Sequence, residues 1–227
     1  MTRPPLRIAV LASGRGSNLQ AILNAISAGR LAAQIVGVFS DKPKALALQR
    51  AREHAIPAQA VSPRDFATRI AHDEDLFGRI DAVRPDLIVC AGYMRLVSER
   101  EVSARPGRMI NIHPSLLPAF KGLHTHQQAL DAAVGEHGAS IHFVSAELDG
   151  GPVIAQARVP VLPGDDAATL GQRVLEREHP LLVETLRLFA DGRVALVGST
   201  VQVDHRTLGH PLQLDREDRL VPSPSGN

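Results

Sequence analysis

The chain has 227 residues, of which 44% are hydrophobic, and its 25 Lys and Arg against 24 Asp and Glu leave a formal charge of +1. This size and composition predict a globular protein with a substantial core, and the scattered basic residues argue against nucleic acid or an anionic membrane as a partner. No run of about 20 apolar residues is present, and the apolar run before the first glycines is too short for a signal peptide, so we expect a cytoplasmic protein.

The first half of the chain alternates predicted strands and helices. Strands are predicted over residues 6–12, 34–40, 58–61 and 87–91, and helices over 19–28, 45–54 and 66–83. The first strand is apolar on both faces, which is typical of a central parallel strand covered by helices. The alternation therefore predicts a parallel sheet with helices on both faces. Cys90, the only cysteine, lies in an apolar run without a basic neighbour, which favours a buried, inert thiol.

A glycine-rich turn, Gly14 to Asn18, joins the first strand to the first helix. Backbone N–H groups and the helix dipole meet there, which favours a bound phosphate, and the Ser17 and Asn18 side chains would add donors or cap the helix. A dinucleotide site needs a third glycine where Leu19 stands, although Asp41 would suit the acidic position of such a site. A single terminal phosphate fits the turn better than a dinucleotide.

In the second half of the chain, the regular alternation of predicted strands and helices ends. Strands are predicted over 109–113, 140–144 and 153–161, a long amphipathic helix over 169–189, a hairpin over 193–203 around Gly198-Ser199, and disorder over 220–227. With little helix between the last two strands, a mixed or antiparallel region is expected. The predicted fold class is thus α/β, with a mostly parallel twisted sheet and a mixed or antiparallel C-terminal part.

The strand Met109–His113 carries two polar side chains, Asn111 and His113, which alternation places on one face. Pro114 ends the strand, and an irregular segment follows. An amide and an imidazole two residues apart form a plausible pair for stabilising an oxyanion. The same residue types at a strand end also serve as loop-capping groups, and spacing alone leaves both interpretations open.

Five blocks of the sequence carry a resemblance to a known family. They are GRGSNLQAIL at 14–23, AGYMRL at 91–96, NIHPSLLPAFKGLHTHQQAL at 111–130, HGASIHFVSAELDGGPVI at 137–154 and REHPLLVETLRLFADGRV at 177–194. In this order they closely resemble phosphoribosylglycinamide formyltransferases, the enzymes of de novo purine synthesis that use folate. The resemblance implies a single formyltransferase-type domain over 1–197, with a phosphate-binding N-terminal half and a folate cleft in the C-terminal half. Residues 198–227 would be a partly disordered extension.

The resemblance also implies the chemistry of three residues. Asn111, His113 and Asp149 match the family's catalytic trio. In such enzymes the glycinamide amine attacks the formyl carbon of 10-formyltetrahydrofolate, and Asn111 and an imidazolium at His113 would donate to the formyl oxygen. Asp149 would favour the charged form of His113 and help to remove the proton of the attacking amine.

Further residues are implied to bind the two substrates. For the ribonucleotide these are Gly16, Ser17 and Asn18 at the phosphate and Glu178 at the ribose or glycinamide end. For the folate they are Arg69, Met94, Arg95, Leu96, Val97, Asn111, Ala146, Glu147, Leu148 and Asp149. Glu178 also reads as an exposed helix carboxylate, and the surroundings of Arg69 match the family poorly.

Several histidines raise the question of a metal. They are His113, His124, His126 and His142, with Asp149 as a further ligand. No cysteine or HxxxH pattern supports a metal site, so none is expected. His126 is expected instead to cap a helix starting near Gln127, and His142 to line the cleft or to satisfy the core.

The trio also occurs in methionyl-tRNA formyltransferase, in the hydrolase domain of formyltetrahydrofolate dehydrogenase and in formyltetrahydrofolate deformylase, so it leaves the acceptor open. The short tail after Arg193 has no basic excess, unlike the transfer-RNA enzyme, and the phosphate turn is absent from the deformylase. Glycinamide ribonucleotide is therefore the expected acceptor, with the deformylase and, more remotely, a nicotinamide dehydrogenase as alternatives. A binding-only protein would require damage to the trio or the turn, and none is seen. We expect small-molecule substrates only, and a monomer or homodimer.

Overall fold

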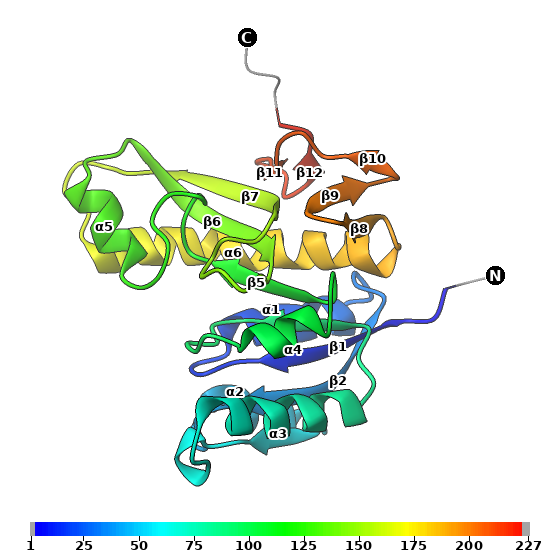
Figure 1. Cartoon of the computed structure of the whole chain (residues 1–227). Coiled ribbons are helices and arrows are strands. Elements are labelled where there is room, and N and C mark those ends of the chain that lie inside the picture. The colour runs from blue at the N-terminus through cyan, green and yellow to red at the C-terminus, as the bar shows by residue number, and fades with distance from the viewer. Residues whose placement is uncertain (1–2, 224–227) are drawn as a thin grey trace. The chain divides into compact units, whose positions relative to one another are not determined.

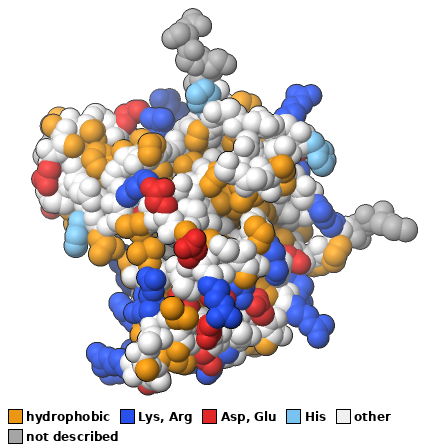
Figure 2. Space-filling model, in the orientation of Figure 1, with side chains coloured by type: hydrophobic (Ala, Val, Ile, Leu, Met, Phe, Trp, Pro, Cys, Tyr) orange, Lys and Arg blue, Asp and Glu red, His pale blue; other side chains and the backbone are white. Residues whose placement is uncertain are grey.

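The computed structural model describes residues 3–223. The chain divides into two compact units: the first runs to Asn111 and includes Val144–Ala146, and the second comprises Ile112–Phe143 and the chain from Glu147 onward. Within the described residues, no helix combines the length and the apolar character that crossing a membrane requires. On the face drawn in Figure 2, Lys and Arg side chains lie among Asp and Glu side chains.

The first unit is a parallel sheet with helical connections (Figure 1). Its elements are β1 (Leu6–Leu11), α1 (Ser17–Ser27), β2 (Ala33–Ser40), α2 (Leu46–Glu53), β3 (Ala58–Ala60), the 3-10 helix η1 (Pro63–Asp65), α3 (Arg69–Ala82), β4 (Leu87–Cys90), α4 (Glu99–Ser103) and the start of β5 (Met109–His113). The strands are ordered β5-β4-β1-β2-β3, and every neighbouring pair is parallel. The predicted parallel alternation is confirmed.

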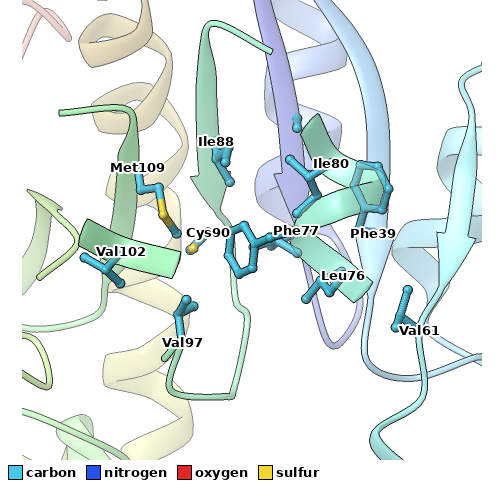
Figure 3. Packing of buried hydrophobic residues seen from close by; sticks show 12 residues of the cluster. Phe39, Val61, Leu76, Phe77, Ile80, Ile88, Cys90, Val97, Val102 and Met109 are labelled. Atoms are coloured by element: carbon cyan, nitrogen blue, oxygen red, sulfur yellow. The ribbon is translucent and has the colours of Figure 1, made fainter. Parts of the chain in front are cut away.

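The core of this unit lies between α3 and one face of the sheet (Figure 3). Phe77 of α3 packs in one cluster with Leu11 of β1 and Cys90 of β4. Ile8 and Val10, on the opposite face of β1, are equally buried, so both faces of the sheet are covered. Cys90 is buried, as predicted, and burial raises the pKa of its thiol to about 12, which disfavours the reactive thiolate.

The predicted helix over 66–83 is wrong at its start. Phe66 has extended backbone, and α3 begins at Arg69 with Thr68 as its N-cap, whose hydroxyl accepts the backbone N–H of Ala71 at 3.1 Å. A Thr at this position stabilises a helix start because it satisfies a backbone donor that has no partner inside the helix. Helix α4 was not predicted, because five residues are too few to show a helical period.

The second unit is built around an antiparallel pair of long strands and the longest helix (Figure 1). Its elements after β5 are α5 (Thr125–Asp131), β6 (Glu136–Phe143), β7 (Val153–Pro160), α6 (Ala167–Ala190), β8 (Val194–Val197), β9 (Thr200–Val203), β10 (Arg206–Thr207), β11 (Leu212–Leu214) and β12 (Leu220–Val221). β6 pairs antiparallel with β7, and β8, β9 and β10 form a small antiparallel sheet. The mixed C-terminal part and the hairpin at Gly198-Ser199 are confirmed, as is the α/β fold class.

Helix α6 packs against β6 and β7 through one apolar face. Asp166 caps its start by accepting the backbone N–H of Thr169 at 2.7 Å. The helix continues through Pro180, and Glu178 lies buried in the turn before that proline.

The predicted disorder over 220–227 is wrong for Leu220–Val221, which form β12 and pair with β11. β11 in turn pairs with β7, and Arg177 of α6 holds the connecting loop through Asp218 at 2.6 Å. These partners lie far away in the sequence, so local composition does not reveal them. Residues 224–227 lie outside the described residues.

Candidate active site

The glycine-rich turn opens α1 with backbone groups alone. Gly16 is the N-cap residue, has a left-handed φ of 71°, and no side chain caps the helix. A Cβ at Gly16 would lie 2.8 Å from the Cα of Ala47, so only glycine fits. The Ser17 and Asn18 side chains lie in the first turn of the helix and do not cap it. The first N–H groups of α1 and its dipole therefore suit an anion.

Helix α2 and a buried hydroxyl hold this turn. The backbone N–H of Ala47 donates to the Gly14 carbonyl at 3.2 Å, and Arg50 Nε donates to the Arg15 carbonyl at 2.9 Å. The Ser13 hydroxyl donates to Asp41 Oδ1 at 2.6 Å, and both residues are buried. Because the buried Asp41 carboxylate already accepts a hydrogen bond from Ser13, it is poorly suited to bind the ribose of a dinucleotide. This weakens the dinucleotide interpretation.

The segment Met94–Val97 presents apolar side chains beside a donor. Met94 and Leu96 are 61% and 44% exposed, whereas Val97 is buried in the core cluster. Arg95 Nε is buried without a hydrogen-bond partner in the described structure. Exposed apolar side chains next to a buried donor are typical of a surface that binds a flat, polar ligand.

The first unit has a cavity at the end of its strands opposite to the glycine-rich turn. It measures about 700 Å³ and is lined by residues such as Arg7, Gln34, His54 and Arg84, which lie at strand starts or after helix ends. Ligands of parallel sheets bind outside the carboxyl ends of the strands, where the glycine-rich turn lies. We therefore do not assign this cavity to the substrates.

Asn111 and His113 are both on β5, as predicted. Asn111 is half-buried beside Cys90 of β4 and closes the first unit, and His113 is buried at the start of the second. His113 Nδ1 lies 3.5 Å from Asp149 Oδ2, while its Nε2 is 2.9 Å from the carbonyl oxygen of Phe120. Since a carbonyl only accepts, Nε2 carries a hydrogen and donates to it.

Asp149 is held in an uncommon conformation between two histidines. Its φ is 46°, in the left-handed region, and its Oδ2 accepts the backbone N–H of Gly122 at 2.9 Å. His142 Nε2 lies 3.7 Å from its Oδ1, whereas His113 lies nearest to Oδ2. Burial lowers the pKa of His142, and the nearby Asp149 acts in the opposite direction. Strained backbone at a carboxylate beside two imidazoles is typical of a functional site.

His142 and Gly122 were not predicted to contact Asp149. The sequence predicts that His142 lines the cleft or satisfies the core; it is buried, and its neighbour is the Asp149 carboxylate. For Gly122, the residue type itself indicates an unusual backbone conformation, because glycine readily adopts a φ such as the 80° found here. No sequence pattern identifies the carbonyl of Phe120 as the acceptor for His113.

The prediction that His126 caps a helix is wrong. Helix α5 begins at Thr125 with His124 as its N-cap residue, and His126 lies inside the helix. Its Nδ1 is 3.1 Å from Nε2 of the buried His137, so one ring donates to the other. His137 was not singled out from the sequence.

The buried His137 predicts a pH dependence of stability. Burial, followed by the nearby His126 and His113, lowers the pKa of His137 from 6.5 to about 4. Between these values the unfolded chain binds more protons than the folded protein, so the free energy of unfolding falls as the pH is lowered. We expect His137→Gln to flatten this fall between about pH 7 and about pH 5, measured by urea unfolding. The exposed His210→Gln serves as control, and an unchanged pH slope in His137→Gln would contradict the assignment.

The remaining predicted residues fall into both units. Glu178 is buried in α6, which rules out the alternative of an exposed carboxylate, and Arg69 is exposed at the start of α3. Glu147 pairs with Lys121 at 2.6 Å, and Leu148 is exposed beside Gly122. Ala146, also exposed, belongs to the first unit. Among residues 3–223, no group of three or more His, Cys, Asp or Glu side chains has an arrangement that would hold a metal ion.

Residues 6–186 match the formyl transferase family, and the chain belongs to that family. It is 45% identical to the phosphoribosylglycinamide formyltransferase of Escherichia coli strain K12, over 89% of this chain and 96% of that protein. The structure of phosphoribosylglycinamide formyltransferase from Coxiella burnetii superposes with a TM-score of 0.87 at 45% identity, covering 90% of this chain and 96% of that one. A formyltetrahydrofolate deformylase from Pseudomonas putida is more distant, at 26% identity and a TM-score of 0.78 over 88% of this chain and 70% of that one. The resemblance seen in the sequence is confirmed.

Proposed function

We propose that this protein transfers the formyl group of 10-formyltetrahydrofolate to the amine of 5'-phosphoribosylglycinamide, giving formylglycinamide ribonucleotide and tetrahydrofolate for purine synthesis. The observation that carries the proposal is the glycine-rich turn at Gly16, which opens α1 without a side-chain cap from the N-cap residue, and such a helix start suits an acceptor that ends in a phosphate. The high identity to proteins named for this reaction, over nearly their full length, supports it.

In this proposal, Asn111 donates its amide N–H to the formyl oxygen as negative charge builds there. His113 donates beside it, and Asp149 accepts the proton of the attacking amine, directly or through water. The bond between the formyl carbon and N10 of the folate then breaks, and a proton passes to N10, which balances the proton lost by the amine. The distance of 3.5 Å between His113 Nδ1 and Asp149 Oδ2 supports this division, because it places the carboxylate directly beside the imidazole ring.

The hydrogen bond from His113 to Phe120 adds one requirement. Nε2 already donates to the Phe120 carbonyl at 2.9 Å, so this N–H is not free to reach a substrate. In the reacting complex the formyl oxygen takes the place of that carbonyl as acceptor. The loop that carries Phe120, whose own φ is 54°, then has to move away from the ring.

The substrate contacts follow the same assignment. Gly16, Ser17 and Asn18 bind the phosphate, and the buried Glu178 binds the ribose or glycinamide end. Met94, Arg95, Leu96, Val97, Ala146, Glu147, Leu148 and Arg69 contact the folate, together with Asn111 and Asp149. The buried, unpaired Arg95 Nε supports a polar ligand at its segment. The proposal includes 10-formyltetrahydrofolate as co-substrate, no metal, no nucleic acid or membrane partner, a cytoplasmic location, and a monomer or homodimer.

The acceptor is tested by following folate absorbance with purified protein and 10-formyltetrahydrofolate, with and without the ribonucleotide. We expect deformylation only when 5'-phosphoribosylglycinamide is present. Glycinamide ribonucleoside, which lacks the phosphate, serves as the matched control and is expected to react far more slowly because the turn at Gly16 has no anion to bind. Equal rates with and without the ribonucleotide would make water the acceptor and favour the deformylase.

A further inference from the structure

The segment Met94–Val97 is held at both ends by buried side chains from distant parts of the first unit. At its start, the backbone N–H of Met94 donates to the Ser13 hydroxyl at 3.0 Å. Immediately after its end, the backbone N–H of Ser98 donates to Asp73 Oδ2 at 2.8 Å. Between these two bonds, the segment exposes the side chains of Met94 and Leu96. Its backbone position is therefore set from outside the segment.

The carboxylate of Asp73 is aimed by a neighbouring histidine. His72 Nδ1 lies 3.0 Å from Asp73 Oδ1, and its Nε2 lies 3.0 Å from the Val61 carbonyl. The carbonyl can only accept, so Nε2 carries a hydrogen, and the contact with Oδ1 needs one more proton, on either partner. With Oδ1 engaged by His72, Oδ2 points to Ser98. The ring of Phe66 packs edge-on against His72, with centroids 5.5 Å apart, and fixes the imidazole.

Packing alone does not explain an aspartate at this position. Asp73 is 2% exposed and lies on the face of α3 that carries Leu76, Phe77 and Ile80, where an apolar side chain would continue the core. Burying a carboxylate is costly unless its oxygens are satisfied, and here both oxygens have partners. The Asp73 carboxylate accepts the backbone N–H of Ser98 and so fixes the end of the Met94–Val97 segment.

Val97 supplies the third anchor. It is buried in the core cluster with Val61 and Phe77, the cluster drawn in Figure 3, and it directly precedes Ser98. Asp73 and Val97 together thus define where the chain leaves the core, and hence where the backbone from Met94 to Leu96 lies at the surface.

We propose that Asp73 is a positioning residue for the folate: through the N–H of Ser98 it sets the Met94–Val97 backbone against the pterin, and His72 aims its carboxylate. This inference rests on the proposed function, in which that segment binds the folate. Asp73 touches no substrate, so its loss weakens folate binding and leaves ribonucleotide binding unchanged.

The test compares Asp73→Ala with wild type by calorimetry, using tetrahydrofolate and 5'-phosphoribosylglycinamide as separate ligands, and by KM for 10-formyltetrahydrofolate. We expect the folate Kd and KM to rise about tenfold or more, because a hydrogen bond to a charged group is lost, and the ribonucleotide Kd to stay within about twofold. Asp73→Asn is expected to restore most folate affinity, since its carbonyl accepts from Ser98 and its amide donates to His72. Asp75→Ala is the control and should change the affinity for neither ligand, because Asp75 is a half-exposed residue that pairs with Arg79 on the same helix.

Melting curves show which variants fold. If Asp73→Ala does not fold, Asp73→Leu, which keeps the branched shape of the side chain without an acceptor, replaces it with the same expectation. Unchanged folate affinity, an equal loss for both ligands, or folding only of the Asn variant would overturn the positioning role, since each outcome points to stability alone. A wild-type protein that binds no tetrahydrofolate would instead contradict the proposed function.

Discussion

Asp149→Asn is expected to lower kcat by about 10²- to 10⁴-fold, the range for loss of a general base, while the Kd for 5'-phosphoribosylglycinamide stays near that of wild type. The amide has the same shape as the carboxylate, and Asn adopts left-handed φ as readily as Asp, so the φ of 46° is preserved. The Asn carbonyl still accepts from Gly122. What disappears is the negative charge beside His113 and His142 and the ability to take a proton.

Steady-state kinetics with both substrates and calorimetry with the ribonucleotide measure this effect. Asp131→Asn is the control, because Asp131 is an exposed helix residue whose carboxylate accepts a hydrogen bond from Gln127 on the same helix. Full turnover in Asp149→Asn would remove Asp149 from the chemistry. A fall in kcat with an equally large loss of ribonucleotide binding would point to a disturbed fold.

Gly16→Ala is expected to cost both stability and ribonucleotide binding. A left-handed φ for alanine costs about 1–2 kcal/mol, and the contact of its Cβ with the backbone of Ala47 about 1–3 kcal/mol. A loss of roughly 2–5 kcal/mol corresponds to a Tm lower by roughly 4–20 °C in a chain of this size. If the variant folds, the displaced N–H groups of α1 should raise the KM for the ribonucleotide at least about tenfold, with a smaller change for folate.

Gly14→Ala, two residues earlier, is the comparison for stability. A Cβ at Gly14 meets nothing within 4 Å, so its free energy of unfolding should stay within about 0.5 kcal/mol of wild type. Thermal melting followed by circular dichroism separates the two variants. Equal Tm values for Gly14→Ala and Gly16→Ala would show that α2 yields to the new side chain and that glycine is not needed at the turn.

The parallel strands, the helix α6 and the glycine-rich turn were readable from the sequence because each is written in a local pattern. The strand Met109–His113 alternates over five residues, and Gly16 lies between an apolar strand and an amphipathic helix. Where local patterns were weak, the predictions failed. The sequence pattern predicts helix before Arg69, but Thr68 is the N-cap, a role that depends on its backbone angle. The composition predicts disorder at Leu220–Val221, but these residues form β12, which depends on pairing with β11.

Residue types and their spacing were enough to predict the α/β class, the alternation of the first half, the glycine-rich turn and the family to which the chain belongs. Those features depend on residue types at short spacing, which physical propensity and motif matching can read. The contacts around the proposed site residues could be seen only in the folded chain: the Gly122 N–H on Asp149, the Phe120 carbonyl on His113, and Asp73 at the end of the Met94–Val97 segment. Hydrogen bonds between residues far apart in the chain exist only after the core has closed, because packing, and not sequence spacing, brings their atoms within bonding distance.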